Sequence, residues 1–221
     1  MPAHSWTLQP IHFVDFEGNL SSGILEFGAA TVLGGEVVAS ATALCRPTGR
    51  VRTEDTAVHG LDAGALSDKR PFADEFERFS RLRETGPLAS HFSGAENSLI
   101  KSVWPYPRQS PDFGAGGTDW GPWVDTGRLY PQFYRGLRSA RLEDLVADFN
   151  LLEKLDALAA KVCPEGRRRF HAALYDALAG ALLLARLAEE PSLRDKSPAW
   201  LLAMSTLDGA RRGELSQPEL F

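Results

Sequence analysis

The first part of the chain alternates apolar runs with turns that contain glycine. Three of these runs are typical of β-strands, and they cover Ile11 to Glu17, Ile24 to Val32 and Glu36 to Arg46. The intervening sequences GNLSSG and GG suit hairpin turns. The pattern therefore predicts a three-stranded antiparallel meander.

Helical periodicity dominates the rest of the chain. It predicts helices over Phe72 to Arg83, Ala95 to Val103, Leu142 to Phe149, Leu152 to Val162 and Phe170 to Ala188. Two short strand-like runs interrupt these helices, at Leu88 to His91 and Trp123 to Asp125, as in a parallel extension of the sheet. We therefore expect an α/β domain. Residues 105–122 are rich in Pro and Gly and carry Tyr106 and Trp120, which predicts a surface loop.

Composition limits the class of protein. A chain of 221 residues with 43% hydrophobic content can bury one core of ordinary size. Cys45 and Cys163 form no CxxC or Cys/His pattern, and the first ten residues show no secretory signal, so we expect a protein of the reducing cytoplasm. The longest apolar run, Ala177 to Ala188, is too short to span a bilayer and contains Arg186, so no membrane role is expected. The net charge of -5 argues against a broad basic surface that would coat nucleic acid, but it allows an enzyme that grips a few phosphates.

The sequence HFVDFEGN places two acids at the end of the first strand. Asp15 and Glu17 are two residues apart, so on a strand both side chains point to the same face. Converging carboxylates repel each other unless a cation or a shared proton compensates them. A divalent metal site is one interpretation, and an edge strand with two solvated acids is the alternative.

Two later segments carry further candidate groups. In SHFSGAEN, His91 ends a short apolar strand and Glu96 lies at the start of a helix, where an acid is also common for dipole reasons. In FHAALYD, His171 and Asp176 are five residues apart, which on a continuous helix separates their side chains by roughly 140°. The two converge only if His171 lies at an irregular start of the helix and Asp176 in its first turns. A mobile imidazole beside a fixed carboxylate would then suit a general base next to a metal ligand.

Taken in order, these segments resemble the three motifs of the DEDDh, or DnaQ-like, family of 3'-5' exonucleases. FVDFEGN resembles the first motif, SHFSGAEN the second and HAALYD the third. AVHGL resembles the family's His-Gly segment near the terminal nucleotide, WVDTGRLY resembles the strand-to-helix step before the last motif, and RLEDLVADFNL resembles a leucine-rich acidic helix of the family. The resemblance covers about Ile11 to Glu190. It implies an RNase H-like fold, with a mixed five-stranded sheet flanked by helices.

The second motif departs from the family pattern at two positions. The family usually has Asp where this chain has Glu96, and the Asn that usually follows the motif's histidine is Phe92 here. The extra methylene of Glu96 displaces its carboxylate by about one C–C bond, which perturbs direct metal coordination yet allows contact through water. We expect activity to be retained in altered form, with a slow or inactive enzyme as the alternative.

The resemblance also implies a set of roles. Asp15, Glu17 and Asp176, helped by Glu96, would hold two Mg2+ or Mn2+ ions, and His171 would take the proton from the attacking water. The expected substrate is the 3' end of single-stranded DNA or RNA, and the expected reaction is stepwise release of mononucleotides. The residues expected near substrate are Phe16, Gly18, Asn19, His59, Gly60, Leu61, His91 and Phe92.

The two aromatic residues among these remain open to two interpretations. Phe16 and Phe92 flank the acids and would suit stacking on terminal bases, because such stacking holds single strands without reading sequence. Equally, both rings could belong to the core. Three functions therefore stay in view: a DNA exonuclease, an exoribonuclease with the same chemistry, and a catalytically weak module that binds 3' ends.

The last five residues, QPELF, resemble the short peptide that binds the bacterial sliding clamp. Gln217, Leu220 and Phe221 would be its contact residues, on a tail with no obvious core to join. An ordinary C-terminus that packs back on the domain is the alternative. We expect an exonuclease domain over residues 1–195, followed by a C-terminal helix and tail over residues 196–221.

Overall fold

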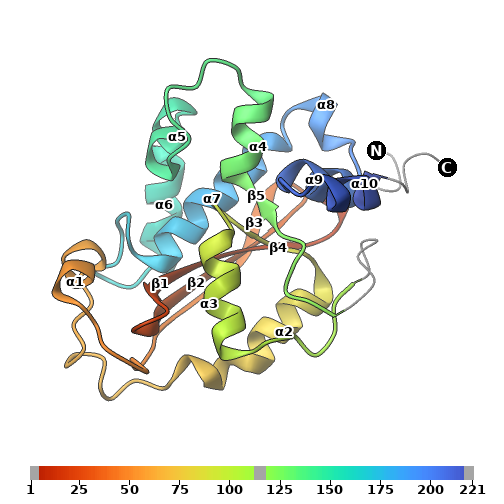
Figure 1. Cartoon of the computed structure of the whole chain (residues 1–221). Coiled ribbons are helices and arrows are strands. Elements are labelled where there is room, and N and C mark those ends of the chain that lie inside the picture. The colour runs from red at the N-terminus through yellow and green to blue at the C-terminus, as the bar shows by residue number, and fades with distance from the viewer. Residues whose placement is uncertain (1–4, 112–117, 217–221) are drawn as a thin grey trace.

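The computed structural model describes residues 5–111 and 118–216, and a five-stranded sheet lies at its centre (Figure 1). The strands are ordered β3-β2-β1-β4-β5. Their bounds are β1 (Ile11–Asn19), β2 (Gly23–Leu33), β3 (Glu36–Leu44), β4 (Leu88–Ser90) and β5 (Val124–Asp125). The first three strands form an antiparallel meander, β4 pairs parallel to β1, and β5 pairs parallel to β4. The prediction of an α/β fold with a mixed five-stranded sheet is confirmed.

Helices cover both faces of this sheet (Figure 1). Helix α7 packs on β1, β2 and β3, whereas α3 contacts β1 from the opposite face together with α2. The helices are α1 (Thr53–His59), α2 (Phe76–Thr85), α3 (Gly94–Val103), α4 (Thr126–Phe133), α5 (Leu142–Asp148), α6 (Leu152–Val162), α7 (Ala173–Leu187), α8 (Pro191–Arg194), α9 (Pro198–Ser205) and α10 (Gly209–Ser216). Short 3-10 turns occupy Trp6–Leu8 and Phe72–Glu75.

The alternation of side chains along β1 divides the core between these two faces. Ile11 and Phe13 pack in the cluster that contains α7, whereas Val14 and Phe16 pack in the cluster that contains α2 and α3. Asp15 continues the series of Ile11 and Phe13, since side chains two apart share a face. The acids at the end of β1 therefore lie on the side of α7.

Two glycines allow α7 to lie very close to the sheet. A Cβ added at Gly28 of β2 would come within 2.1 Å of the Ala173 carbonyl oxygen, and one at Gly180 of α7 would come within 1.9 Å of the Phe13 ring. Any larger residue at either position would push the helix and the strands apart. The close approach brings the first turn of α7, with Asp176, over the end of β1.

The structure differs from the sequence-based expectations in a few places. The helix predicted from Phe170 begins at Ala173, helical periodicity predicts neither α1 nor α8, and α4 is indicated only by the resemblance of WVDTGRLY to a strand-to-helix step. Helix α4 contains Pro131, which weakens a helical pattern. The predicted surface loop over residues 105–122 is only partly one: Tyr106 is 65% exposed, but Trp120 is fully buried and its indole donates a hydrogen bond to the Trp104 carbonyl.

The chain beyond residue 195 continues into the packed core. Leu201, Leu202 and Ala203 of α9 are buried in the same cluster as α7, and the Ser205 hydroxyl accepts a hydrogen bond from the Asp125 amide. The contact residues of the QPELF peptide lie outside the described residues. Within the described ranges, the structure contains no helix with the length and apolarity that crossing a bilayer requires.

Candidate active site

The end of β1 presents the first two acids of the site. In the pairing of β1 with β2, Asp15 lies opposite Gly28 and Glu17 lies opposite Glu26. The register shifts between Glu17 and Gly18, so the strand is irregular directly after the acids. Asp15 thus faces a position without a side chain, under the start of α7, and Glu17 faces a third acid.

The second part of the site is the turn that precedes α7. His171 has a φ of 62°, in the left-handed region, and therefore lies outside the regular helix. Asp176 lies in the first turn of α7, and one of its carboxylate oxygens accepts a hydrogen bond of 2.9 Å from the His171 amide. This is the irregular start of a helix that convergence of the two residues requires.

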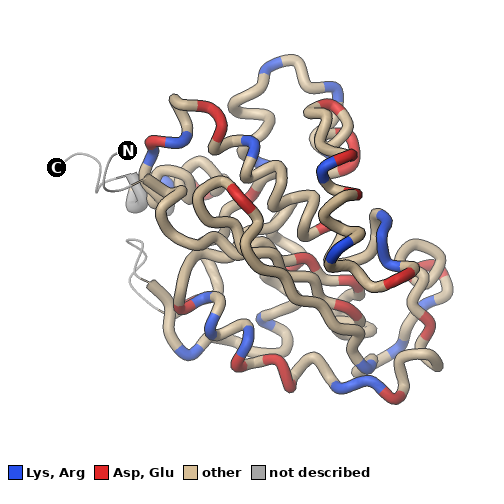
Figure 2. Tube along the Cα trace, turned by 180° about the vertical axis from the view of Figure 1, so that it is seen from behind, with Lys and Arg blue, Asp and Glu red and all other residues tan. Residues whose placement is uncertain are grey.

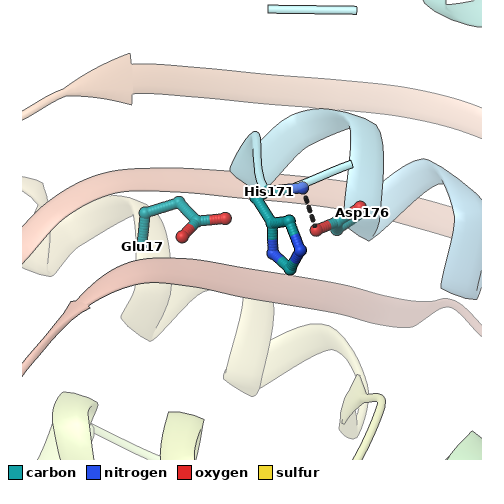
Figure 3. A group of neighbouring side chains, drawn as sticks. All are labelled: Glu17, His171 and Asp176. Atoms are coloured by element: carbon teal, nitrogen blue, oxygen red, sulfur yellow. Dashed lines mark hydrogen bonds between the residues drawn. The ribbon is translucent and has the colours of Figure 1, made fainter. Parts of the chain in front are cut away.

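Glu17, His171 and Asp176 come together at this point (Figure 3). Each offers one ligand atom, and these three atoms all lie within 4.8 Å of one another. In Figure 3 the imidazole of His171 lies between the two carboxylates, with Glu17 reaching from the strand and Asp176 from the helix. His171 is exposed, whereas Asp176 is buried. The imidazole is therefore the member of the group most accessible to solvent, with Glu17 intermediate.

Glu96 supplies a further buried acid from the first turn of α3. It is 7% exposed, and its Oε2 atom has no hydrogen-bond partner within the described part of the chain. The Oδ1 atom of Asp176 is likewise buried without a partner there. Buried carboxylate oxygens are almost always paired, because their desolvation is costly. Unpartnered oxygens of this kind fit a cation.

The pKa values of the acids in the site are raised by burial and by mutual repulsion. Burial raises the pKa of Asp15 well above its usual range, and repulsion from Asp176, Glu17, Glu96 and Glu26 adds to the rise. Burial raises the pKa of Asp176 in the same way, with repulsion from Glu17 next. Burial also raises the pKa values of Glu17 and Glu96 to about 7 each. Without a compensating cation, ionised carboxylates in this cluster oppose one another.

A divalent cation is therefore the group that this donor set fits best. Carboxylate oxygens are the preferred ligands of Mg2+ and Mn2+, and imidazole also suits several transition metals. Asp15, Glu17 and Asp176, together with Glu96, are the residues that could hold such ions. Of the five residues predicted to carry the chemistry, Glu17, His171 and Asp176 meet within ligand distance, and Asp15 and Glu96 lie near enough to act on the cluster electrostatically.

Glu26, which was not among the predicted site residues, joins this site through an ion pair with Arg167. Glu26 is 1% exposed and forms an ion pair with Arg167, and its carboxylate also accepts a hydrogen bond from the Ala173 amide at the start of α7. Arg167 donates further hydrogen bonds to the carbonyl oxygens of His59 and His171. The signal that could have found Glu26 is a lone acid inside the apolar run GILEFGAA, because a buried acid needs a partner.

One predicted substrate contact is wrong. Phe16 is 6% exposed and packs edge-on against Phe72 and next to Phe79, in the cluster below the sheet. It is a core residue because position 16 points to the face opposite Asp15 and Glu17. Its ring offers no surface to a base.

The His-Gly segment is oriented mostly inward. His59 is buried, and its Nδ1 atom accepts a hydrogen bond from the Leu61 amide; Leu61 packs with Leu25 and Leu66. Gly60 is exposed, with a φ of 74° at the end of α1. The side chains of His59 and Leu61 are therefore turned away from solvent, whereas Val58 is 50% exposed and the Arg169 guanidinium lies beside Gly60.

The remaining predicted contacts are divided between turn formation and the site. Gly18 has a φ of 123°, and Asn19 stabilises the turn after β1 by accepting hydrogen bonds from two serine amides and donating one to Asp55.

Both ring nitrogens of His91 form hydrogen bonds, one with the Thr126 hydroxyl and one with the Ala140 carbonyl. Phe92 is 43% exposed. His91 and Phe92 line a hollow of about 370 Å³ together with Arg141, Leu142, Glu143, Phe170, His171 and Asp176.

The charges on the rest of the molecule are mixed. In Figure 2, Lys and Arg are interspersed with Asp and Glu along the helices and loops in view, without one continuous basic stripe. The net charge of -5 is thus distributed among residues of both signs in this view.

This chain is similar to several solved structures. No family model and no curated protein matches the sequence. Solved structures do match: Exonuclease X in complex with 5' overhanging duplex DNA has a TM-score of 0.61 at 20% identity, over 87% of this chain and 99% of that one. The nuclease domain of 3'hExo, a DEDDh family member bound to rAMP, has a TM-score of 0.59 at 17% identity, over 88% of this chain and 98% of that domain.

A third match extends the same fold into a larger protein. E. coli Exonuclease I in complex with a dT13 oligonucleotide has a TM-score of 0.57 at 15% identity, over 81% of this chain and 41% of that chain. Similarity at these identities establishes the fold. The chain therefore has the RNase H-like α/β fold that its motifs predict, and it shares that fold with exonucleases.

Proposed function

We propose that this protein is a metal-dependent 3'-5' exonuclease of the DEDDh type. The observation that carries the proposal is the meeting of Glu17, His171 and Asp176, with their ligand atoms within 4.8 Å of one another, on the fold of known exonucleases. A binding module has no need for clustered carboxylates that raise one another's pKa values. A phosphodiesterase needs such a cluster to hold its cations.

The residues of the site suit the steps of phosphodiester hydrolysis. Asp15, Glu17 and Asp176, helped by Glu96, would hold two Mg2+ or Mn2+ ions, which when bound lower the pKa of a water ligand and neutralise charge on the phosphate. His171 is exposed beside Asp176 and would accept the proton of the attacking water through an imidazole nitrogen. The hydrogen bond from its own amide to Asp176 fixes the turn on which the imidazole is carried.

We propose single-stranded DNA as the main substrate, with RNA as the second candidate. Exonuclease X was solved with DNA and 3'hExo with rAMP, so proteins of this fold bind both DNA and a ribonucleotide. A protein distinguishes the two by its contacts to the 2'-OH. The third candidate, a weak module that binds 3' ends, rests on Glu96 in the place of the family's usual Asp.

The test is release of mononucleotides from matched DNA and RNA oligonucleotides labelled at the 3' or the 5' end, in Mg2+, Mn2+ or EDTA. We expect metal-dependent release of the 3' label as mononucleotide and a ladder of shortened 5'-labelled products, both absent in Asp15→Ala. Binding without cleavage in either metal would favour the weak module, and Glu96→Asp would then show whether the extra methylene is responsible. Full activity in Asp15→Ala would exclude the proposed site.

The sequence also supports a proposal about a protein partner. QPELF at Gln217 to Phe221 would bind a bacterial sliding clamp through Leu220 and Phe221. The protein would then work in the cytoplasm, where its two cysteines would stay free, as they are in the structure. Deleting Glu214 to Phe221 should abolish clamp binding and leave cleavage of free oligonucleotides unchanged. Absence of clamp binding by the intact chain would reject this proposal.

A further inference from the structure

An exposed aromatic ring lies at the rim of the candidate active site. Phe92 is 43% exposed and lines the same hollow as His171 and Asp176. Its φ is 63°, in the left-handed region that a bulky residue rarely adopts. A ring held outward in an unfavourable backbone conformation indicates that something other than core packing maintains it.

One buried carboxylate fixes the turn that carries this ring. Asp125 is 3% exposed, and it accepts hydrogen bonds from the amides of Phe92 and Ser93, both at 3.0 Å, and from the Ser93 hydroxyl at 3.1 Å. It also accepts one from the Arg128 amide at 3.2 Å. The position of the Phe92 backbone is thus set before any ligand binds, which lowers the entropy cost of a contact with it.

The surroundings of the ring are shaped for it. A Cβ at Gly127 would come within 2.7 Å of the Phe92 Cδ1 and Cε1 atoms, so only glycine allows the ring to lie where it does. The guanidinium of Arg128 lies 5.8 Å from the ring centroid and is 41% exposed. The edge of the ring meets His91 at a centroid distance of 4.8 Å. Despite these contacts, 43% of the residue remains exposed.

Arg128 connects this ring to a second hollow. That hollow has a volume of about 430 Å³, and Ser93, Asn97, Lys101, Asp125 and Arg128 are among the residues that line it. Within residues 5–111 and 118–216, the carboxylate that pairs with the Arg128 side chain is that of Asp125, at 4.0 Å from Nε, so toward this part of the chain the guanidinium retains donors for another anion. The Phe92–Arg128 pair therefore lies between the candidate active site and a second polar hollow.

We propose that Phe92 and Arg128 bind the penultimate nucleotide of the substrate, with the ring stacked on its base and the guanidinium on a backbone phosphate. The inference rests on the proposed function, because it places the terminal nucleotide in the hollow with His171 and Asp176. A chain leaving that hollow past Phe92 meets Arg128 next and then the second hollow. Stacking on an aromatic ring accepts any base, and arginine suits phosphate, so the site would hold single strands of any sequence.

The experiment is a scan of single abasic sites in a fluorescein-labelled single-stranded DNA hexamer. Binding is measured by anisotropy in EDTA, and cleavage is measured on the same oligonucleotides in Mg2+. For the wild type, loss of the penultimate base should weaken binding by about 5- to 100-fold, and the same change should raise KM with little effect on kcat. Phe92→Ala should bind the intact hexamer more weakly by a similar factor and should no longer respond to loss of that base, whereas Phe92→Tyr should behave as the wild type.

Arg128→Ala should reduce the slope of log affinity against log salt by about 0.7, the loss of one phosphate contact on a single strand. Tyr106→Ala and Arg108→Ala are matched controls, since they remove an exposed aromatic ring and an exposed arginine elsewhere. An unchanged affinity and an unchanged abasic profile in Phe92→Ala would overturn the inference. Binding that depends on Phe92 without cleavage in any metal would instead reject the exonuclease and keep the site, and a wild type that neither binds nor cleaves would reject both.

Discussion

Glu26 and Arg167 are 141 residues apart in the sequence and form an ion pair next to the candidate metal ligands, with Glu26 buried and Arg167 partly buried. The pair joins β2 to the loop that carries His171: the Arg167 Nε atom donates to Glu26 over 3.1 Å, and the same guanidinium donates to the carbonyl oxygens of His59 and His171. Arg167 also lowers the pKa of Glu17, although burial and repulsion from Glu26 raise it more. One arginine thus positions two loops and partly offsets the repulsion between two acids.

Arg167→Ala should therefore lower both stability and activity. Removing one partner leaves Glu26, which is 2% exposed at its side chain, as an unpaired buried charge, and breaking a buried pair costs about 3–5 kcal/mol. The free energy of unfolding in urea measures the first effect, and 3'-end cleavage measures the second. Arg168→Ala, which removes an exposed arginine next along the chain, is the control and should change neither. An Arg167→Ala protein as stable as the wild type would show that the pair makes no net contribution.

Asp15→Asn should separate metal binding from folding. The amide removes a charge that burial and four neighbouring acids disfavour, so the metal-free variant should melt at a temperature equal to or above that of the wild type. Its activity should fall at least about 100-fold, because a metal ligand is weakened. The rise in melting temperature on adding Mg2+ should also shrink. A lower melting temperature in EDTA would show that the Asp15 carboxylate stabilises the fold by itself.

The stabilising effect of Mg2+ should grow with pH. Burial raises the pKa values of Glu17 and Glu96 from 4.5 to about 7 in the folded protein. Between pH 4.5 and pH 7 the folded state therefore binds more protons than the unfolded state. Protonation of Glu17 and Glu96 thus stabilises the metal-free fold at low pH, and this stabilisation is lost as pH rises. Above pH 7 both acids are ionised and available to the cation, so the Mg2+-induced rise in melting temperature should be larger at pH 8 than at pH 5.5.

A buried histidine contributes the opposite pH dependence but does not affect this comparison. Burial lowers the pKa of His12 to about 4, so its contribution to stability is lost as pH falls from 6.5 toward 4, with or without Mg2+. The difference between melting curves with and without Mg2+ removes it. An equal Mg2+ effect at both pH values would mean that Glu17 and Glu96 do not bind the cation.

His171→Ala should lower cleavage by about 10²- to 10⁴-fold, the usual contribution of a general base. The structure makes a second role possible, because the imidazole lies within ligand distance of Glu17 and Asp176. Calorimetric titration with Mn2+ distinguishes the two: an unchanged affinity assigns His171 to proton transfer, whereas a weakened affinity makes it a metal ligand. Loss of metal binding together with activity would thus contradict the proposed role of His171.

The sequence predicts those features that depend on local spacing. A period of two along β1 places Asp15 and Glu17 on one face, and the geometry of a helix requires His171 to lie before the first regular turn, as it does. The sequence does not predict features that depend on strand register. Glu26 has no spacing relation to Glu17 in the sequence, and only the antiparallel pairing of β1 and β2 places one opposite the other.

The burial of the two aromatic residues beside the site is only partly predictable from local sequence patterns. Phe16 and Phe92 both lie beside the motif residues in the sequence, and the alternation along the strand favours the core for Phe16 but indicates nothing for Phe92. The difference is that Phe16 follows the strand period into the lower core, whereas hydrogen bonds to Asp125, which lies 33 residues from Phe92, hold Phe92 outward. That carboxylate comes from a strand of two residues, which a sequence pattern cannot place relative to His91.

Gly28→Ala should damage the site without touching any acid. The new Cβ would lie 2.1 Å from the Ala173 carbonyl oxygen, so α7 must move away from the sheet, at a cost of about 1–3 kcal/mol. Asp15 lies opposite Gly28 in the strand pair and Asp176 lies in the first turn of α7, so the same movement separates the two acids. A displacement of about 1 Å in such a site can lower turnover by about 100-fold. Gly209→Ala is the control, because nothing lies within 4 Å of its added Cβ. Urea unfolding and 3'-end cleavage of both variants test the prediction, and wild-type activity in Gly28→Ala would mean that close packing of α7 on β2 does not set the distance between the acids.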